Sequence, residues 1–255
     1  MTTTLPDPSF LRWPSNSSEQ YITARRTLLE AEYALIQQIE AVAQQRRALP
    51  PGPVLPTYVF EEGCLNLNSD APPKQVTLAD VAKEEAKKPL VVYHMMMGEQ
   101  EEKACSGCSM FLDSLNGVAT QLSQRINLIV VAKAPLSAIR AYALRRQWHN
   151  LRFLSSSSNS FNKDMGMEAP AWMPEMKQAP GFSVFLYEEG GEGEEGKLRF
   201  WYQQSPIFGR KGGETGNGPQ GDMVVRGMDL LTPVWNILDI TPEGRGEKDL
   251  EYDGK

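Results

Sequence analysis

The sequence has few cysteines and histidines and no long hydrophobic run. It has three cysteines among 255 residues, an odd number that argues against a scaffold held by disulfides. No stretch approaches the roughly 18 apolar residues of a membrane span, and the N-terminal residues lack the basic and apolar regions of a secretory signal. We therefore expect a cytoplasmic protein without a membrane partner.

Positive charge is also scarce. The chain has 26 lysines and arginines against 32 aspartates and glutamates, for a net charge of −6. It therefore lacks the basic surplus typical of proteins that bind nucleic acid or anionic lipid. Apolar residues make up 41% of the chain and charged residues 23%, which is ordinary globular composition. Collagen, wholesale disorder and a long coiled coil are thereby excluded as classes.

An apolar stripe predicts a long helix over residues 18–47. Ser17, followed three residues later by Gln20, resembles a capping box, and prolines at 50 and 51 end the run. Such a stripe packs on its own domain or on a second copy, and a homodimer through this helix stays open. The stripe residues recur at steps of three and four: Tyr21, Ala24, Leu28, Ala31, Leu35, Ile39 and Val42.

The rest of the chain alternates between strands and helices. Continuous apolar runs predict strands buried on both faces, and the periodicity between them predicts helices. This order indicates an α/β fold, with a central mixed sheet flanked by helices. Strands are expected at 58–60, 90–96, 126–131, 181–187 and 197–202, and helices near 76–81 and over 109–125, 135–146 and 228–240.

The motif that carries chemistry is Cys105-Ser106-Gly107-Cys108. It follows the strand at 90–96 and immediately precedes the helix at 109–125. A cysteine at a helix N-terminus is favoured as the thiolate by the helix dipole and the unsatisfied N–H groups. Cysteines three apart can close a disulfide across that turn. The pattern predicts a redox pair in which Cys105 attacks and Cys108 resolves, with no cofactor.

Two other interpretations of the cysteines stay open. Thiolates at this spacing can bind zinc or copper, with Cys64, His94 and the methionines at 95–97 as further candidate ligands. We assign no metal ligands, because only Cys64 remains for a site of four thiolates. In the second interpretation the spacing is a coincidence without chemical meaning, because cysteine is a common buried apolar residue. His94 ends the strand before the motif, where it either tunes Cys105 or is simply satisfied by its neighbours.

These residues resemble a known family, the thioredoxin-like family DUF899 of predicted dithiol-disulfide oxidoreductases, from about residue 18 to 245. The resemblance implies three parts: an arm and long helix over 1–52, a thioredoxin-like domain over 53–245 and an acidic tail over 246–255. Its members commonly have proline where this chain has Ser106. The matching segments are Thr77-Leu78-Ala79-Asp80, Val92-Tyr93-His94-Met95-Met96-Met97-Gly98, Cys105-Ser106-Gly107-Cys108-Ser109, Ala132-Lys133-Ala134-Pro135-Leu136, Ser155-Ser156, Phe161-Asn162-Lys163-Asp164-Met165-Gly166, Pro180-Gly181-Phe182-Ser183-Val184-Phe185, Arg226-Gly227-Met228-Asp229-Leu230-Leu231 and Leu238-Asp239-Ile240-Thr241-Pro242-Glu243-Gly244-Arg245.

The resemblance implies exchange between the dithiol and a thiol or disulfide substrate, either a protein or a small molecule. In thioredoxin-like folds a cis-proline before a buried strand faces the dithiol and docks the substrate, and Pro180 has that place here. The expected substrate-binding residues are Pro180, His94, Ser106 and Gly107. The alternatives are a small-molecule tailoring enzyme with a cleft near Cys105 and His94, a metal-binding module and a dimeric interaction protein. The residues before Cys105 do not match the motif of peroxiredoxins.

Overall fold

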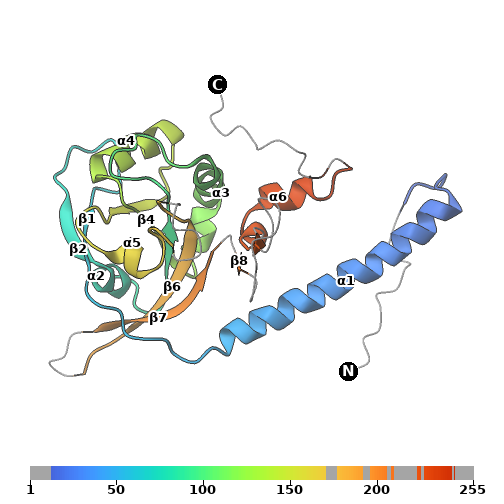
Figure 1. Cartoon of the computed structure of the whole chain (residues 1–255), viewed down its shortest axis with the longest axis horizontal. Coiled ribbons are helices and arrows are strands. Elements are labelled where there is room, and N and C mark those ends of the chain that lie inside the picture. The colour runs from blue at the N-terminus through green and yellow to red at the C-terminus, as the bar shows by residue number, and fades with distance from the viewer. Residues whose placement is uncertain are drawn as a thin grey trace. The chain divides into compact units, whose positions relative to one another are not determined.

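The computed structural model describes residues 13–170, 177–191, 196–205, 208–209, 223–224, 227–242 and 244 (Figure 1). The chain divides into two compact units, Met1–Pro50 and Pro51–Lys255. The predicted acidic tail lies outside the described residues. No helix in the described ranges is long and apolar enough to cross a membrane.

The described residues of the first unit form the helix α1 (Glu19–Arg47), which confirms the helix predicted from the apolar stripe. Its cap is Ser18 and not Ser17: the Ser18 hydroxyl accepts a hydrogen bond from the Tyr21 N–H at 3.2 Å. None of the 29 residues of α1 is buried.

The second unit is built on a seven-stranded mixed sheet with the order β2-β1-β5-β4-β3-β6-β7. The three strands β3, β4 and β5 are parallel, and the other neighbours in the sheet are antiparallel. The strands are β1 (Val59–Glu62), β2 (Lys74–Thr77), β3 (Leu90–His94), β4 (Asn127–Ala132), β5 (Arg152–Ser155), β6 (Gly181–Glu188) and β7 (Lys197–Gln204).

Helices connect the parallel strands and cover both faces of the sheet. The sequence β3-α3-β4-α4-β5, followed by the antiparallel hairpin β6-β7, is the arrangement of a thioredoxin-like fold, which confirms the predicted class. A separate two-stranded sheet pairs β8 (Phe208–Gly209) with β9 (Met223–Val224). The helices of this unit are α2 (Leu78–Lys83), α3 (Ser106–Leu122), α4 (Leu136–Arg146), α5 (Phe161–Asp164), a 3₁₀ turn (Asp229–Leu231) and α6 (Pro233–Leu238).

Each face of the sheet carries its own core. One core contains Tyr93 of β3 with Leu112 of α3 and Ile139 of α4. The other contains Val92 of β3 with Phe161 of α5 and residues of α2. Because successive side chains of a strand point to opposite faces, β3 contributes to both cores.

The structure corrects several predicted boundaries. The strand predicted to reach 96 ends at His94, and the helix predicted from 109 begins at Ser106. The closing helix predicted over 228–240 is divided by Thr232, whose extended backbone precedes Pro233. Proline has no N–H and favours a helix's first turn, so α6 starts anew there. The strands β2 and β5 were not predicted.

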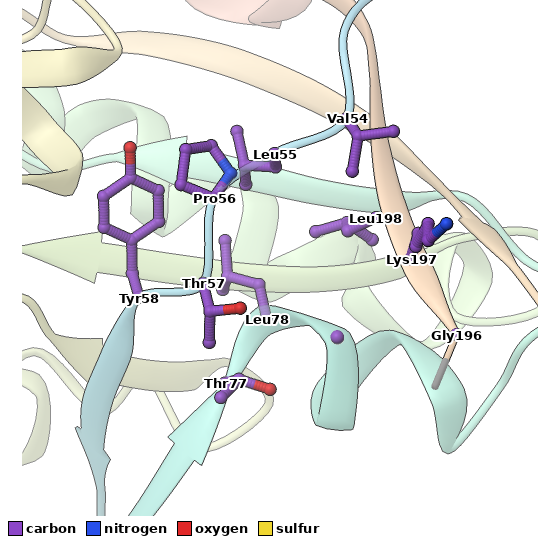
Figure 2. A pocket seen from close by; sticks show the side chains of 11 residues that line it. Val54, Leu55, Pro56, Thr57, Tyr58, Thr77, Leu78, Gly196, Lys197 and Leu198 are labelled. Carbon is purple, nitrogen blue, oxygen red and sulfur yellow. The ribbon is translucent and has the colours of Figure 1, made fainter. Parts of the chain in front are cut away.

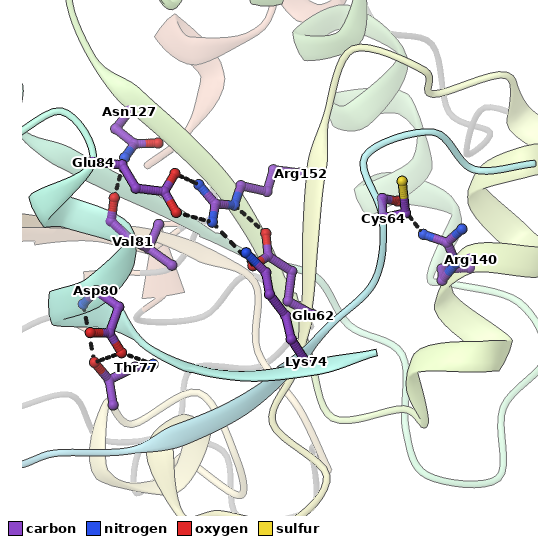
Figure 3. Close-up of polar contacts among 10 residues, drawn as sticks. All are labelled: Glu62, Cys64, Lys74, Thr77, Asp80, Val81, Glu84, Asn127, Arg140 and Arg152. Carbon is purple, nitrogen blue, oxygen red and sulfur yellow. Dashed lines mark hydrogen bonds and ion pairs between the residues drawn. The ribbon is translucent and has the colours of Figure 1, made fainter. Parts of the chain in front are cut away.

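A partly buried ionic cluster joins β1, β2, β5 and the end of α2 (Figure 3). The Arg152 guanidinium forms an ion pair with Glu62, which is 2% exposed, and hydrogen bonds with Glu84 at 2.6 and 3.0 Å. Lys74 contacts the same Glu62 carboxylate at 3.0 Å. These hydrogen bonds hold the pKa of Glu84 below its usual value. The cluster thus connects strands that are far apart in the sequence.

Candidate active site

The two cysteines of the motif lie at the start of α3. Cys105 is the N-cap residue, with φ −50° and ψ 139°, and Cys108 lies in the first turn. Cys105 is half-buried and Cys108 is 2% exposed, and both are free thiols. Only the N-terminal thiol is therefore open to a substrate, as the predicted division of roles requires.

The chain after β3 wraps around the dithiol. The Met96 carbonyl oxygen accepts a hydrogen bond from the Cys105 N–H at 2.9 Å, and the Met96 N–H donates to the Cys108 sulfur at 3.3 Å. One residue further, the Met97 N–H donates to the side-chain oxygen of Gln178 at 2.8 Å. Backbone groups of one short segment thus fix the positions of both cysteines.

The two thiols have opposite pKa shifts. The hydrogen bond from the Cys108 thiol lowers the pKa of Cys105 to about 6, and the first-turn N–H groups of Cys108 and Gly107 act in the same direction. The same hydrogen bond, together with burial, raises the pKa of Cys108 well above its usual value. At neutral pH Cys105 is therefore the thiolate and Cys108 is the thiol that donates a hydrogen bond to it.

Tyr93 lies beneath the dithiol. Its side chain is fully buried, with its ring stacked on Phe111 of α3. The Tyr93 hydroxyl has no hydrogen-bond partner among the described residues, yet it is close enough to Cys108 to lower the pKa of that thiol. A buried donor without a partner is uncommon in folded proteins, and this one lies beside the resolving cysteine.

A cleft of about 240 Å³ opens beside Cys105. Part of its wall comes from the segment before β6, which the sheet topology brings next to the cysteine loop because β6 pairs with β3. Sequence reasoning missed Lys177 and Gln178, and the nearby Pro180 was the only signal for that segment. The residues lining the cleft are Met96, Glu101, Lys103, Ala104, Cys105, Lys177 and Gln178.

The structure brings Cys105, Ser106, Gly107 and Cys108 together in one turn. Pro180 is half-buried directly before Gly181, which pairs with the last residue of β3, but it does not line the cleft. The described residues include no cis peptide bond, so the Ala179–Pro180 bond is trans, unlike the cis-proline of thioredoxin-like folds.

The structure does not bring His94 to the thiols. His94 follows Tyr93 in β3 and points to the opposite face, where its ring stacks on Phe161 at 5.4 Å between centroids. Its Nε2 forms a hydrogen bond with the Ser183 hydroxyl at 2.8 Å. Burial lowers the pKa of His94 to about 3. His94 is therefore neutral at physiological pH and separated from Cys105 by the sheet.

Among the other candidate ligands, Met96 lines the cleft beside Cys105, whereas Cys64 does not. Within the described ranges, no three histidine, cysteine or acidic side chains are grouped to hold a metal ion. Cys64 lies in the loop after β1, where Arg140 binds its carbonyl oxygen (Figure 3). A pocket of about 440 Å³, with no cysteine in its lining, lies between residues 54–58, the start of α2 and the start of β7. Figure 2 shows the side chains that line it.

Comparisons with solved structures find distant similarity to peroxiredoxins. Reduced Prx3 of Vibrio vulnificus in complex with H₂O₂ is 13% identical, with a TM-score of 0.43, over 67% of this chain and 94% of that chain. Peroxidoxin BcpB of Mycobacterium tuberculosis is 12% identical, with a TM-score of 0.39, over 53% of this chain and 78% of that chain. A likeness this distant carries no information about the reaction.

Comparison with curated proteins gave no match. In contrast, the model of one protein family covers almost the whole chain. Its description is "Bacterial protein of unknown function (DUF899)", and the match spans residues 12–254. That span includes α1, the complete sheet and the motif at the start of α3. The chain therefore belongs to the DUF899 family.

Proposed function

We propose that this protein is a thiol–disulfide oxidoreductase in which Cys105 is the attacking residue and Cys108 the resolving residue. The observation that carries the proposal is the asymmetry of the pair. The N-cap thiol opens to a cleft and has a pKa near 6, whereas its partner is buried and has a raised pKa. Dithiol exchange requires such a pair: an accessible thiolate that attacks the substrate and a second thiol that resolves the mixed disulfide.

The reaction follows from this arrangement. The Cys105 thiolate attacks one sulfur of a substrate disulfide, so that a mixed disulfide forms and the other substrate sulfur leaves as a thiolate. Cys108 then loses its proton and attacks the Cys105 sulfur. The Cys105–Cys108 disulfide forms and the second substrate sulfur leaves. Two electrons pass to the substrate, whose two thiolates take up one proton from Cys108 and one from solvent.

Substitution of either cysteine by serine tests the proposal. Cys105→Ser is expected to abolish reduction of a model disulfide, because no attacking thiolate remains. Cys108→Ser is expected to trap the mixed disulfide at Cys105, because the resolving thiol is missing. Mass spectrometry after alkylation, at defined ratios of reduced to oxidised glutathione, measures the Cys105–Cys108 disulfide in the wild type and the mixed disulfide in Cys108→Ser.

Cys64→Ser is the matched control, since it makes the same change at a thiol in the loop after β1. It is expected to leave disulfide reduction unchanged. If Cys105→Ser retains activity, or both thiols of the pair stay reduced at every glutathione ratio, the proposal is wrong. Such a result would favour the alternative function, a tailoring enzyme that binds a small molecule in the cleft beside Cys105.

Tyr93→Phe is expected to stabilise the fold and to slow the resolving step. The substitution removes a buried hydroxyl without a partner, and leaving such a group unsatisfied costs about 1 kcal/mol or more. When Cys108 ionises to attack, however, the hydroxyl can donate to its thiolate. Losing that bond is expected to prolong the mixed disulfide about tenfold, measured by quenched-flow alkylation.

Tyr142→Phe provides the comparison for Tyr93→Phe. The Tyr142 hydroxyl is buried like that of Tyr93, but it forms a hydrogen bond with the Ser109 hydroxyl at 2.8 Å. Its removal is expected to lower the free energy of unfolding by about 1 kcal/mol. If Tyr93→Phe lowered the free energy of unfolding as much as Tyr142→Phe, the Tyr93 hydroxyl would already have a hydrogen-bond partner in the resting protein, contrary to this prediction.

A further inference from the structure

The long helix of the first unit has an apolar stripe that none of the described residues of that unit covers. The described part of the unit contains only α1, and none of its residues is buried. Leu28 is 51% exposed and Leu35 57% exposed. The stripe runs from Tyr21 to Val42, a length of about 32 Å at 1.5 Å per residue. Such a surface needs a partner of similar length.

The order of side chains along the stripe is self-complementary. Without the small Ala31 at its midpoint, the stripe has intervals of 3, 4, 7, 4 and 3 residues between Tyr21, Ala24, Leu28, Leu35, Ile39 and Val42. These intervals are the same in both directions along the helix. In a two-fold symmetric dimer the same surface of each copy faces the other, and two such helices run either antiparallel or parallel. The spacing fits the reversed arrangement, because six of the seven stripe residues then face another stripe residue. Ala31, at the midpoint, faces Glu32 of the second copy.

We propose that α1 pairs with α1 of a second copy of this chain in antiparallel orientation. The two-fold axis then passes near Ala31 and Glu32, the midpoint of the stripe. Leu28 packs against Leu35 of the second copy. The proposal is independent of the redox chemistry proposed above.

Side-chain size favours the antiparallel arrangement over the parallel one. In antiparallel order Ala24 faces Ile39 of the second copy, so that a small residue meets a large one. In parallel order Ala24 would face its own copy, and so would Ile39. Gaps would then alternate with crowding, and well-packed interfaces avoid both.

Charge at the midpoint is compatible with this pairing. The two copies of Glu32 approach each other there, which would be unfavourable for bare carboxylates. Within each helix, however, Glu32 already forms an ion pair with Arg25 at 2.9 Å. Ala31 beside it allows the two backbones to approach closely.

The first test is the mass of the full chain in solution under reducing conditions, measured by light scattering over a wide range of concentrations. We expect twice the mass of one chain for the wild type. Leu28→Glu combined with Leu35→Glu is expected to give the mass of one chain. The matched control, Gln37→Glu with Gln44→Glu, adds the same charge at the same spacing on the polar face and is expected to stay dimeric.

A second test measures the orientation and does not depend on the glutamate variants. Leu28→Cys and Leu35→Cys chains are prepared separately, with the three native cysteines replaced by serine. Oxidation of their mixture is expected to give a covalent dimer. Either chain alone is expected to give little covalent dimer. In an antiparallel pair its two new cysteines lie seven residues apart along the helix, about 10 Å, which is too far for a disulfide.

Three results would overturn the proposal. A wild-type chain that stays monomeric at all concentrations would mean that the stripe packs on the chain's own second unit. A dimer that survives both glutamate substitutions would place the interface elsewhere. Efficient crosslinking of the Leu28→Cys chain with itself would show a parallel pair.

Discussion

Replacing Arg152 by methionine is expected to lower the free energy of unfolding by about 3 kcal/mol. The substitution leaves the Glu62 carboxylate buried, at 2% exposure, with Lys74 as its remaining ion-pair partner (Figure 3). A buried charge that loses a partner costs more than the pair contributed, because the desolvation remains while the attraction is gone. Urea unfolding followed by tryptophan fluorescence measures the loss. Trp148 is buried against Phe153, the neighbour of Arg152, and provides the signal.

Two further variants separate burial from charge pairing in this cluster. Glu84→Gln removes a half-exposed partner of the same guanidinium and is expected to cost less than about 1 kcal/mol. Glu62→Leu combined with Arg152→Met removes both buried charges and is expected to recover most of the stability lost in Arg152→Met. A double variant as unstable as Arg152→Met would indicate that lost packing, and not the unpaired carboxylate, explains the effect.

The same cluster explains why one strand of the sheet was not predicted. The strand β5 lies between β1 and β4, and three of its four residues are buried. It is short and begins with the charged Arg152, so no apolar run marks it. Tertiary contacts with Glu62 and Glu84 satisfy that charge in the fold. The strand β2 was missed for a different reason: it is an edge strand with Val76 as its one buried residue.

The central strands could be predicted because both of their faces are covered. The runs that became β3 and β4 are apolar at nearly every position, as burial on two sides requires. The dithiol was equally accessible to sequence reasoning, since its spacing and its place before a helix are local properties.

The walls of the site could not be predicted in the same way. Lys177 and Gln178 reach Cys105 only because β6 pairs with β3, and that pairing is a property of the topology. Tyr93 and His94 are neighbours in β3, and alternation along a strand predicts that only one of them faces the dithiol. The sequence does not say which face of β3 the following helix covers. The structure shows that it is the face of Tyr93.

The position of His94 predicts a loss of stability in mild acid. Its folded-state pKa is about 3, whereas an unfolded histidine titrates near pH 6.5. The unfolded chain therefore binds a proton that the folded chain does not, so stability falls as the pH drops below 6.5. The loss is about 1.4 kcal/mol per pH unit. Between pH 6.5 and about pH 4.5 we expect a decrease of about 2 kcal/mol, because the unfolded histidine is already half protonated at pH 6.5.

Other groups titrate mostly outside this window. The carboxyl groups of Asp80, Glu84 and Asp164 have lowered pKa values, so their contributions are lost only below their usual values of 3.8 to 4.5. The pKa of Cys105 is lowered to about 6 from a usual 9.0, so its contribution falls between about pH 9 and pH 6.

His94→Leu is expected to remove the decrease in stability between pH 6.5 and about pH 4.5, because the titrating group is gone. The Ser183 hydroxyl keeps its hydrogen bond from the Gln203 amide at 3.0 Å in this variant. His149→Gln changes the other histidine, which is exposed, and is expected to retain the wild-type decrease. Urea unfolding at a series of pH values compares the three proteins. An equal decrease in all three would mean that a group other than His94 causes it, and that the burial of His94 between β3 and α5 costs nothing in acid.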